Sequence, residues 1–275
     1  MKIYRTAAGV YLQRADRWLL LDESMDELLS MANLRAHLDS LSASGANFTD
    51  EPSAGEFLAP LSSQEVWAAG VTYFRSRDAR MEEAETAGGG DFYDRVYSAE
   101  RPELFYKSPG QRVVGPGGEV RIRGDATWNV PEPELTIVMS SRGNIVGYTI
   151  GNDMSSRDIE GENPLYLPQA KVYDGSAAVG PCILVSEEPL PQETGISMTI
   201  TRDGKVVFED AVTLAALKRS PEELAGYMYR ETSYPQGSFL MTGTGIVPPS
   251  SFTLKSGDEI SIHIDPVGTL ANRVQ

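Results

Sequence analysis

Two glutamates, Glu132 and Glu134, are the side chains whose spacing most clearly suggests chemistry. They stand directly before the apolar run Leu135–Met139, which predicts a strand. Because side chains alternate along a strand, both carboxylates should point to one face. Two like charges held together repel each other, and a divalent cation such as Mg²⁺, which prefers oxygen ligands, removes that cost. The pair is a candidate metal site; a solvated acidic edge is the alternative, since Pro131 and Pro133 indicate a strand start or sheet edge.

Asp153 and Lys171 are the next candidates along the chain. Asp153 follows the apolar run Ile145–Ile150, so it should lie at the end of a strand, although it could equally cap a helix. Lys171 lies among apolar and small residues. Near carboxylates and a metal, such a lysine could carry a proton or bind an anion. The ordinary alternative is a surface ion pair with Asp174.

The charge balance argues against nucleic-acid binding. Against 39 Asp and Glu there are 24 Lys and Arg, a formal net charge of -15, whereas phosphate binding relies on clustered cations. The chain has neither an apolar signal core nor a run of about 18 apolar residues, so no export and no membrane span are expected. A single cysteine, Cys182, excludes an intrachain disulfide, and we expect a cytoplasmic protein.

Histidine chemistry is not favoured, because the chain has two histidines, His37 and His263. A histidine-rich zinc site or a Ser-His-Asp triad would need one of them. The remaining possibility is chemistry based on carboxylates, lysines and a hard metal ion. We expect both histidines to be structural.

The spacing of apolar residues divides the chain into two predicted domains. Residues 1–58 read as short strands and an amphipathic helix from Ser24 to Leu38, which form a small N-terminal α+β domain ending in the polar stretch 42–55. Residues 59–275 contain many short apolar runs, typical of a catalytic domain built mainly of strands. The expected fold class is mainly β with some α (α+β).

Turn and cap residues locate further elements of the second domain. Asp203-Gly204 between two apolar runs predicts a hairpin, and Ser220 followed by Pro221 predicts the start of a helix. An apolar run over 66–73 predicts a strand, and a charged helix is expected over 75–87. The glycines Gly88–Gly90 that follow predict either the hinge of a mobile lid or an ordinary surface loop.

The order of these motifs resembles the fumarylacetoacetate hydrolase family. Several separated motifs in register over residues 66–274 carry the resemblance. They are Glu-x-Glu at 132–134, Gly-Asn-Asp-x-Ser-x-Arg-Asp at 151–158, Lys-x-x-Asp at 171–174, Gly-Pro at 180–181, Thr-Gly-Thr-Gly at 242–245 and Leu-x-x-Gly-Asp at 254–258.

This resemblance implies a mixed β-roll catalytic domain that binds Mg²⁺, or Mn²⁺ or Ca²⁺, through Glu132, Glu134 and Asp153. Lys171 matches the active-site lysine of the family, and Thr244 matches a threonine that helps to hold the substrate carboxylate. In the family a 2-oxo acid is chelated by the metal, which stabilises the enolate formed beside the ketone. A homodimer or homotetramer is also implied.

The chain departs from the hydrolytic members at several positions. Those members carry Tyr-x-x-His and then a glutamate that together activate water, whereas here Ser76 and Ala79 occupy the two positions. These departures, with the segments 76–80, 101–105 and 160–169, resemble the branch of 2-keto-3-deoxy-D-arabinonate dehydratases. Dehydration needs no hydrolytic water, so it is compatible with the missing base.

The branch implies loss of water from 2-keto-3-deoxy-D-arabinonate, or from the xylonate or L-arabinonate equivalent, to give 2,5-dioxopentanoate in non-phosphorylative pentose catabolism. We expect Lys171 to act as the base at C3 and Glu103 as the acid or proton relay, or the reverse. The arginines expected to bind the substrate hydroxyls or carboxylate are Arg75, Arg77 and Arg157. Alternatives are an acylpyruvate-type C–C hydrolase or a 2-oxo acid decarboxylase of the same family, and a non-catalytic ligand-binding protein.

Overall fold

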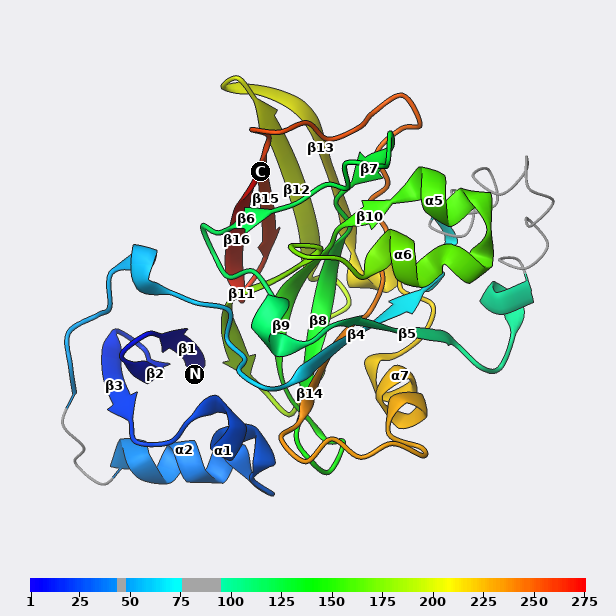
Figure 1. The fold of residues 1–275 in the computed structure, drawn as a ribbon. Helices are drawn as coiled ribbons and strands as arrows, with labels where there is room; N and C mark the ends of the chain where they lie inside the picture. The colour runs from blue at the N-terminus through cyan, green and yellow to red at the C-terminus, as the bar shows by residue number, and fades with distance from the viewer. Residues whose placement is uncertain (44–47, 76–94) are drawn as a thin grey trace.

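Two sheets dominate the protein, which a computed structural model describes for residues 1–43, 48–75 and 95–275 (Figure 1). Short helices lie around them. The nine-stranded sheet has the order β3 (Arg17–Leu21), β2 (Gly9–Arg14), β1 (Lys2–Thr6), β11 (Ala177–Val185), β9 (Ile145–Asp153), β8 (Pro133–Met139), β14 (Ser238–Met241), β4 (Glu65–Gly70) and β5 (Glu103–Ser108). The five-stranded sheet has the order β13 (Lys205–Thr213), β12 (Gly195–Arg202), β15 (Glu259–Ile264), β16 (Gly268–Val274) and β6 (Glu119–Val120).

The remaining elements are short. A two-stranded ladder joins β10 (Ser155–Ser156) to β7 (Asn129–Val130). The α-helices that lie wholly within the described residues are α1 (Met25–Ser30), α2 (Leu34–Ala43), α5 (Arg157–Glu162), α6 (Leu167–Lys171) and α7 (Pro221–Met228). Within the described ranges, no helix is long and apolar enough to cross a membrane.

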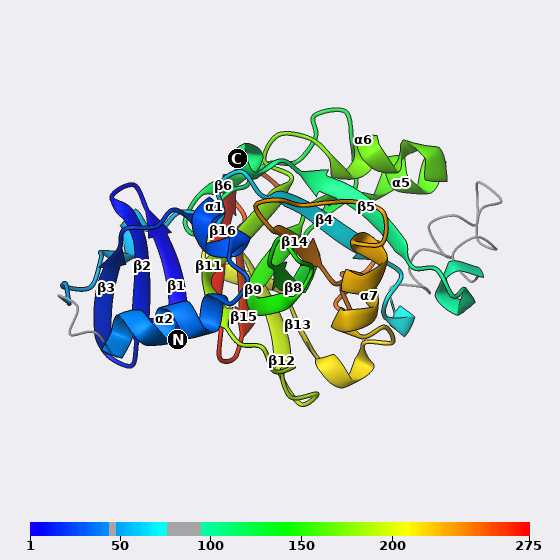
Figure 2. The ribbon, with the colours of Figure 1, turned by 90° about the horizontal axis from the view of Figure 1, so that it is seen from below.

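The N-terminal strands continue the main sheet. β1 pairs antiparallel with β11, with Lys2 opposite Leu184 and Ile3 opposite Ile183. Helices α1 and α2 lie beside β1–β3 (Figure 2), and Leu28 of α1 belongs to the same hydrophobic cluster as Ile183. The first 58 residues therefore share backbone pairing and a core with the rest of the chain, and the division at residue 58 stays a prediction.

The expected helix from Ser24 to Leu38 is two helices, so this prediction was wrong in its continuity. Ser24 starts α1 with a reciprocal capping box to Glu27, and Met31 ends it in an extended conformation. Asn33 then accepts a hydrogen bond from the amide of Ala36, which starts α2. Apolar spacing continued across the break because both helices face the same core.

Several local predictions are confirmed. Asp203 and Gly204 both have positive φ (51° and 74°), as the tight turn between β12 and β13 requires. Ser220 accepts a hydrogen bond from the amide of Glu223 and starts α7. The strand expected over 66–73 is shorter, because Val71 has a φ of 56° and β4 ends at Gly70.

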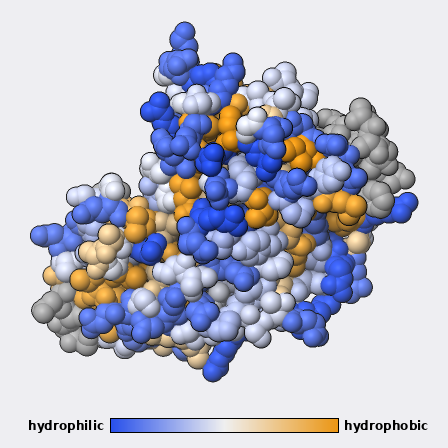
Figure 3. Space-filling view, in the orientation of Figure 1, coloured by the Kyte–Doolittle hydropathy of each residue, from blue (hydrophilic) through white to orange (hydrophobic). Residues whose placement is uncertain are grey.

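The largest core lies between the two sheets. Apolar side chains of β8 and β9, such as Ile137 and Ile150, belong to one buried cluster with those of β12 and β15, such as Met198 and Ile262. On the face in Figure 3, polar side chains predominate and apolar patches are small. Strands β8 and β9 are thus held by the packed core, and α5 and α6 lie near their ends (Figure 1).

We expect Ile3→Ala to lower the free energy of unfolding by about 2–5 kcal/mol, the usual cost of emptying a buried aliphatic site. Ile3 is fully buried and lies opposite Ile183 in the shared sheet. Chemical denaturation of both variants checks this. The control Leu20→Ala alters an exposed residue of β3 and should change stability by about 0.5 kcal/mol or less; equal effects of the two variants would contradict the shared core.

Candidate metal centre and active site

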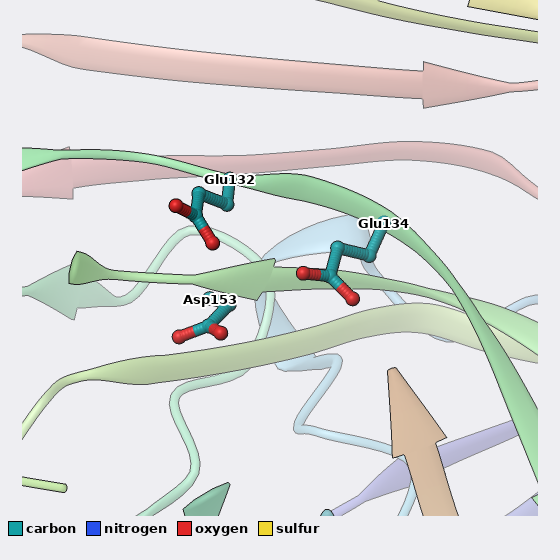
Figure 4. A group of neighbouring side chains, drawn as sticks. All are labelled: Glu132, Glu134 and Asp153. Carbon is teal, nitrogen blue, oxygen red and sulfur yellow. The ribbon is translucent and has the colours of Figure 1, made fainter. Parts of the chain in front are cut away.

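Three carboxylates meet where β8 begins and β9 ends. Ligand oxygens of Glu132, Glu134 and Asp153 all lie within 4.8 Å of one another, and the residues are 5%, 1% and 1% exposed. Figure 4 shows the three carboxylates turned toward one another. The amide of Asp153 donates to the carbonyl of Glu132 (2.9 Å), so strand pairing itself brings the side chains together.

This geometry decides between the alternatives left open by the sequence. Strand β8 lies between β9 and β14, and all its residues are buried, so Glu134 is on a strand inside the sheet rather than on a solvated edge. Pro133 is the first residue of β8, which is the strand-start position that a proline allows. Asp153 is the last residue of β9. The N-cap of the following helix, α5, is Ser156, so Asp153 lies at a strand end and does not cap that helix.

The clustered charges affect the protonation of Glu134. Burial, followed by the charges of Asp153 and Glu132, raises the pKa of Glu134 well above its usual 4.5, and the hydrogen bond from the Gly243 amide opposes this rise. A hard divalent cation would relieve both the repulsion and the desolvation. Three oxygen-donor side chains facing one point are a donor set that fits Mg²⁺.

Lys171 contacts the carboxylates directly. It is the last residue of α6 and is fully buried. Its Nζ lies 2.7 Å from Glu132 Oε2, 3.1 Å from Asp153 Oδ2 and 2.5 Å from Ser155 Oγ. Asp174 instead lies 3.5 Å from Arg112, so the surface-pair alternative for Lys171 was wrong.

Lys107 is a second buried lysine at the site, which the sequence analysis missed. Its Nζ lies 2.5 Å from Asp153 Oδ1 and donates to the backbone carbonyls of Met154 (2.9 Å) and Lys171 (2.5 Å). Burial lowers the pKa of Lys107, and the charge of Asp153 opposes this shift. The period of two along β5 places Glu103 and Lys107 on one face, a signal that could have linked them.

The loop after β14 forms another wall. Gly243 has a φ of +95°, and a Cβ there would lie 1.9 Å from Thr72 Oγ1, so a glycine is required. The hydroxyl of Thr72 donates to the carbonyl of Thr242, which fixes the loop. The Gly243 amide can then donate to Glu134 Oε2, while Thr244 lines the cavity.

The cavity at the carboxylates is about 10 Å³, close to one water-sized sphere. Arg157 lines it, and its Nη2 lies 3.0 Å from Glu132 Oε1. Its wall residues are Ala69, Gly70, Val71, Phe105, Glu132, Glu134, Asp153, Arg157, Lys171, Gly243 and Thr244.

Glu103 lies at the border of this cavity. It is the first residue of β5 and pairs with Gly70 of β4. A Cβ on Gly70 would lie 2.1 Å from Glu103 Oε2, so the carboxyl group packs directly over a residue of the cavity wall. The absence of a side chain at Gly70 is what allows this close approach.

The structure does not bring every candidate to the carboxylates. Arg75 is largely exposed and lies 4.0 Å from Asp210, outside the cavity wall. His37 and His263 are also absent from that wall; their ring nitrogens lie 2.6 Å from Glu23 and 2.9 Å from Thr269. The positions that fall outside the described residues are Arg77, Ser76, Ala79, Gly88–Gly90 and the expected helix beyond residue 75.

Known proteins resemble this chain along most of its length. The sequence model of the family described as "Fumarylacetoacetate (FAA) hydrolase C-terminal" matches residues 76–275. The "Probable 2-keto-3-deoxyxylonate dehydratase" of Haloferax volcanii is 50% identical over 216 residues, 78% of this chain and 73% of that protein. The "2-dehydro-3-deoxy-D-arabinonate dehydratase" of Saccharolobus solfataricus is 43% identical over 218 residues, again 78% of this chain and 73% of that protein.

A solved structure extends the likeness to the fold. It is described as "2-keto-3-deoxy-D-arabinonate dehydratase complexed with magnesium and 2,5-dioxopentanoate", and it matches with a TM-score of 0.85 and 33% identity over 100% of this chain and 99% of that chain. The expected α+β class with a mixed β-roll catalytic domain is therefore confirmed.

We expect Glu134→Gln to stabilise the protein at neutral pH when a chelator removes metal ions. The raised pKa means that folded Glu134 holds its proton more strongly than unfolded Glu134, so its contribution to stability falls as the pH rises above 4.5. The difference between variant and parent should disappear below about pH 4.5, where the carboxyl is protonated in both states.

Thermal unfolding from about pH 4 to about pH 8 checks this. The control Glu259→Gln alters an exposed glutamate of β15 and should follow the parent. A Glu134→Gln protein that unfolds below the parent at neutral pH without metal would contradict the raised pKa.

Proposed function

This chain belongs to the fumarylacetoacetate hydrolase family, and we propose that it is a magnesium-dependent dehydratase of 2-keto-3-deoxy sugar acids. Its substrate would be 2-keto-3-deoxy-D-arabinonate, or the xylonate or L-arabinonate equivalent, and its product 2,5-dioxopentanoate. The observation that carries the proposal is the buried cluster of Glu132, Glu134 and Asp153 in contact with Lys171. The likeness to dehydratases, one of them holding magnesium and 2,5-dioxopentanoate, supports it.

Glu132, Glu134 and Asp153 would hold the magnesium ion. When bound, the ion would supply a Lewis acid that polarises the C2 ketone of the substrate and so acidifies the protons on C3. The same three residues are kept in place by the pairing of β8 with β9 and by the amide of Gly243. Burial of the carboxylates excludes competing water from them.

Lys171 and Glu103 would move the protons. Lys171 takes the proton from C3, the C3–C4 double bond forms, and the C4 hydroxyl leaves as water with a proton from Glu103. The unsaturated alcohol that remains rearranges through its enol to the aldehyde at C5. Exchanging the two roles would give the same product, and both groups lie at the wall or border of the cavity.

The substrate carboxylate would be held by Thr244 and Arg157, which line the cavity. Arg75 and Arg77 follow β4 closely in the sequence and are proposed to contact the sugar hydroxyls when substrate binds. A homodimer or homotetramer in the cytoplasm completes the proposal. Its small-molecule partner is a 2-oxo sugar acid.

The direct test is to incubate purified protein and Mg²⁺ with a panel of 2-keto-3-deoxy pentonates and to measure the aldehyde product. We expect 2,5-dioxopentanoate from at least one of them, and loss of turnover with a chelator, because the carboxylates would no longer hold the ion. Release of pyruvate instead of water would indicate C–C cleavage and would overturn the dehydratase assignment.

Lys171→Ala should lower kcat by about 10²–10⁴-fold, the usual contribution of one general acid–base group. Circular dichroism should confirm that the variant is folded. The matched control is Lys205→Ala, an exposed lysine of β13 that should keep parental kcat. Full activity of folded Lys171→Ala would remove this residue from the mechanism.

A further inference from the structure

Arg219 is a buried arginine that lies just before α7 and contacts the chain segment leading into β5. Its two terminal nitrogens donate to three backbone carbonyls, those of Val96 (3.2 Å), Ala99 (2.6 Å) and Glu100 (3.0 Å). On the other side, its Nη1 lies 2.5 Å from Oε1 of Glu223 in the first turn of α7. One guanidinium group therefore joins α7 to the segment 96–100, which precedes Glu103.

The acceptors around Arg219 match a guanidinium group and no other side chain. Each terminal nitrogen of an arginine carries two N–H donors, and here each has two acceptors. A lysine has three donors on one atom and cannot serve four acceptors spread over this fork. Residues 95–98 are helical, and a cation is favourable beside the carbonyls at the end of a helix.

The two residues before Arg219 hold the chain that leaves β4. Leu217 forms an isolated antiparallel bridge with Tyr73, and the amide of Lys218 donates to the carbonyl of Thr72 (3.0 Å). Thr72 and Tyr73 follow β4 in the sequence, as the segment 96–100 precedes β5. Three consecutive residues thus fasten both chain segments at one end of the β4–β5 pair.

That end of the pair carries the carboxyl group of Glu103. The pairing of Gly70 with Glu103 is the last of the β4–β5 ladder, and within the described residues β5 is the outermost strand of its sheet. The end of an outer strand opens more readily than a central strand, because fewer backbone hydrogen bonds hold it. The place of this carboxyl group over Gly70 therefore depends on what fastens the chain before β5.

We propose that Arg219 is a positioning residue for the reaction: by holding the segment 96–100, it keeps the carboxyl group of Glu103 at the border of the cavity. The inference rests on the proposed function for the role of Glu103 in proton transfer. Arg219 is not among the described residues that line the cavity, so it acts through Glu103. Its loss slows proton transfer and leaves binding of substrate and metal to the other elements of the site.

Steady-state kinetics of Arg219→Gln tests the proposal. We expect kcat to fall about 10–100-fold with KM within about 3-fold of the parent, because a small displacement of a reacting group slows the chemical step. Arg219→Lys keeps the charge with fewer donors and should recover part of the lost kcat. The matched control is Arg202→Gln, which removes an arginine bound to Asp258 and to a carbonyl in the other sheet and should keep parental kcat.

A double-mutant cycle separates positioning from a general loss of structure. Glu103→Gln removes the proton-transfer group, so adding Arg219→Gln to it should lower kcat further by about 2-fold or less. If Arg219→Gln does not fold, Glu223→Gln takes its place in the cycle, since it removes the partner of Arg219 on α7. Independent losses that multiply in the double variant, or parental kcat in the folded single variant, overturn the inference.

Hydrogen exchange of the whole chain, followed by mass spectrometry without substrate, examines the anchor apart from activity. In Arg219→Gln we expect faster exchange of the β5 amides and unchanged exchange in β8, because the outer strand loses its fastening. Unchanged exchange in β5 contradicts the inference, whereas aldehyde formation by the parent still upholds the proposed function. Faster exchange in β5 of a protein whose parent forms no aldehyde upholds the anchor and overturns the proposed function.

Discussion

The burial of three carboxylates beside one another is the constraint on which the rest of the site depends. Water cannot solvate Glu132, Glu134 and Asp153, so their charges need partners that the fold brings to them, in addition to any bound cation. It does so from four directions: a lysine on β5, a lysine at the end of α6, an arginine at the start of α5 and the amide of Gly243. Segments far apart in the chain are therefore held together by one electrostatic requirement.

The sheet gives this arrangement its rigidity. Glu134 and Asp153 stand on neighbouring strands, β8 and β9, inside the nine-stranded sheet. Apolar side chains of the same two strands belong to a packed core. Side chains on central strands move little, since backbone pairing fixes both neighbours. The proton-transfer candidates come from different elements, Lys171 from a helix end and Glu103 from the start of an outer strand.

Sequence reasoning predicted the parts of this site that depend on local periodicity. Alternation along one strand placed Glu132 and Glu134 together, and an apolar run placed Asp153 at a strand end. The sequence did not predict Lys107 as a site residue, because its role depends on the packing of β5 against the end of α6. This contact joins residues that are 64 positions apart. The break between α1 and α2 and the pairing of β1 with β11 were likewise invisible, since an apolar pattern records which face is buried but not what covers it.

The pairing of β1 with β11 also covers backbone groups at one edge of the main sheet. A strand that ends a sheet offers unpaired amides and carbonyls to any neighbouring chain, which is a common route to aggregation. By adding β1–β3, the N-terminal segment moves that edge away from β11, which pairs with the ligand-bearing strand β9, to β3, whose first residue is Arg17. A shortened chain that began after residue 21 would leave Ile183 and Leu184 of β11 without their partner strand and open to self-association.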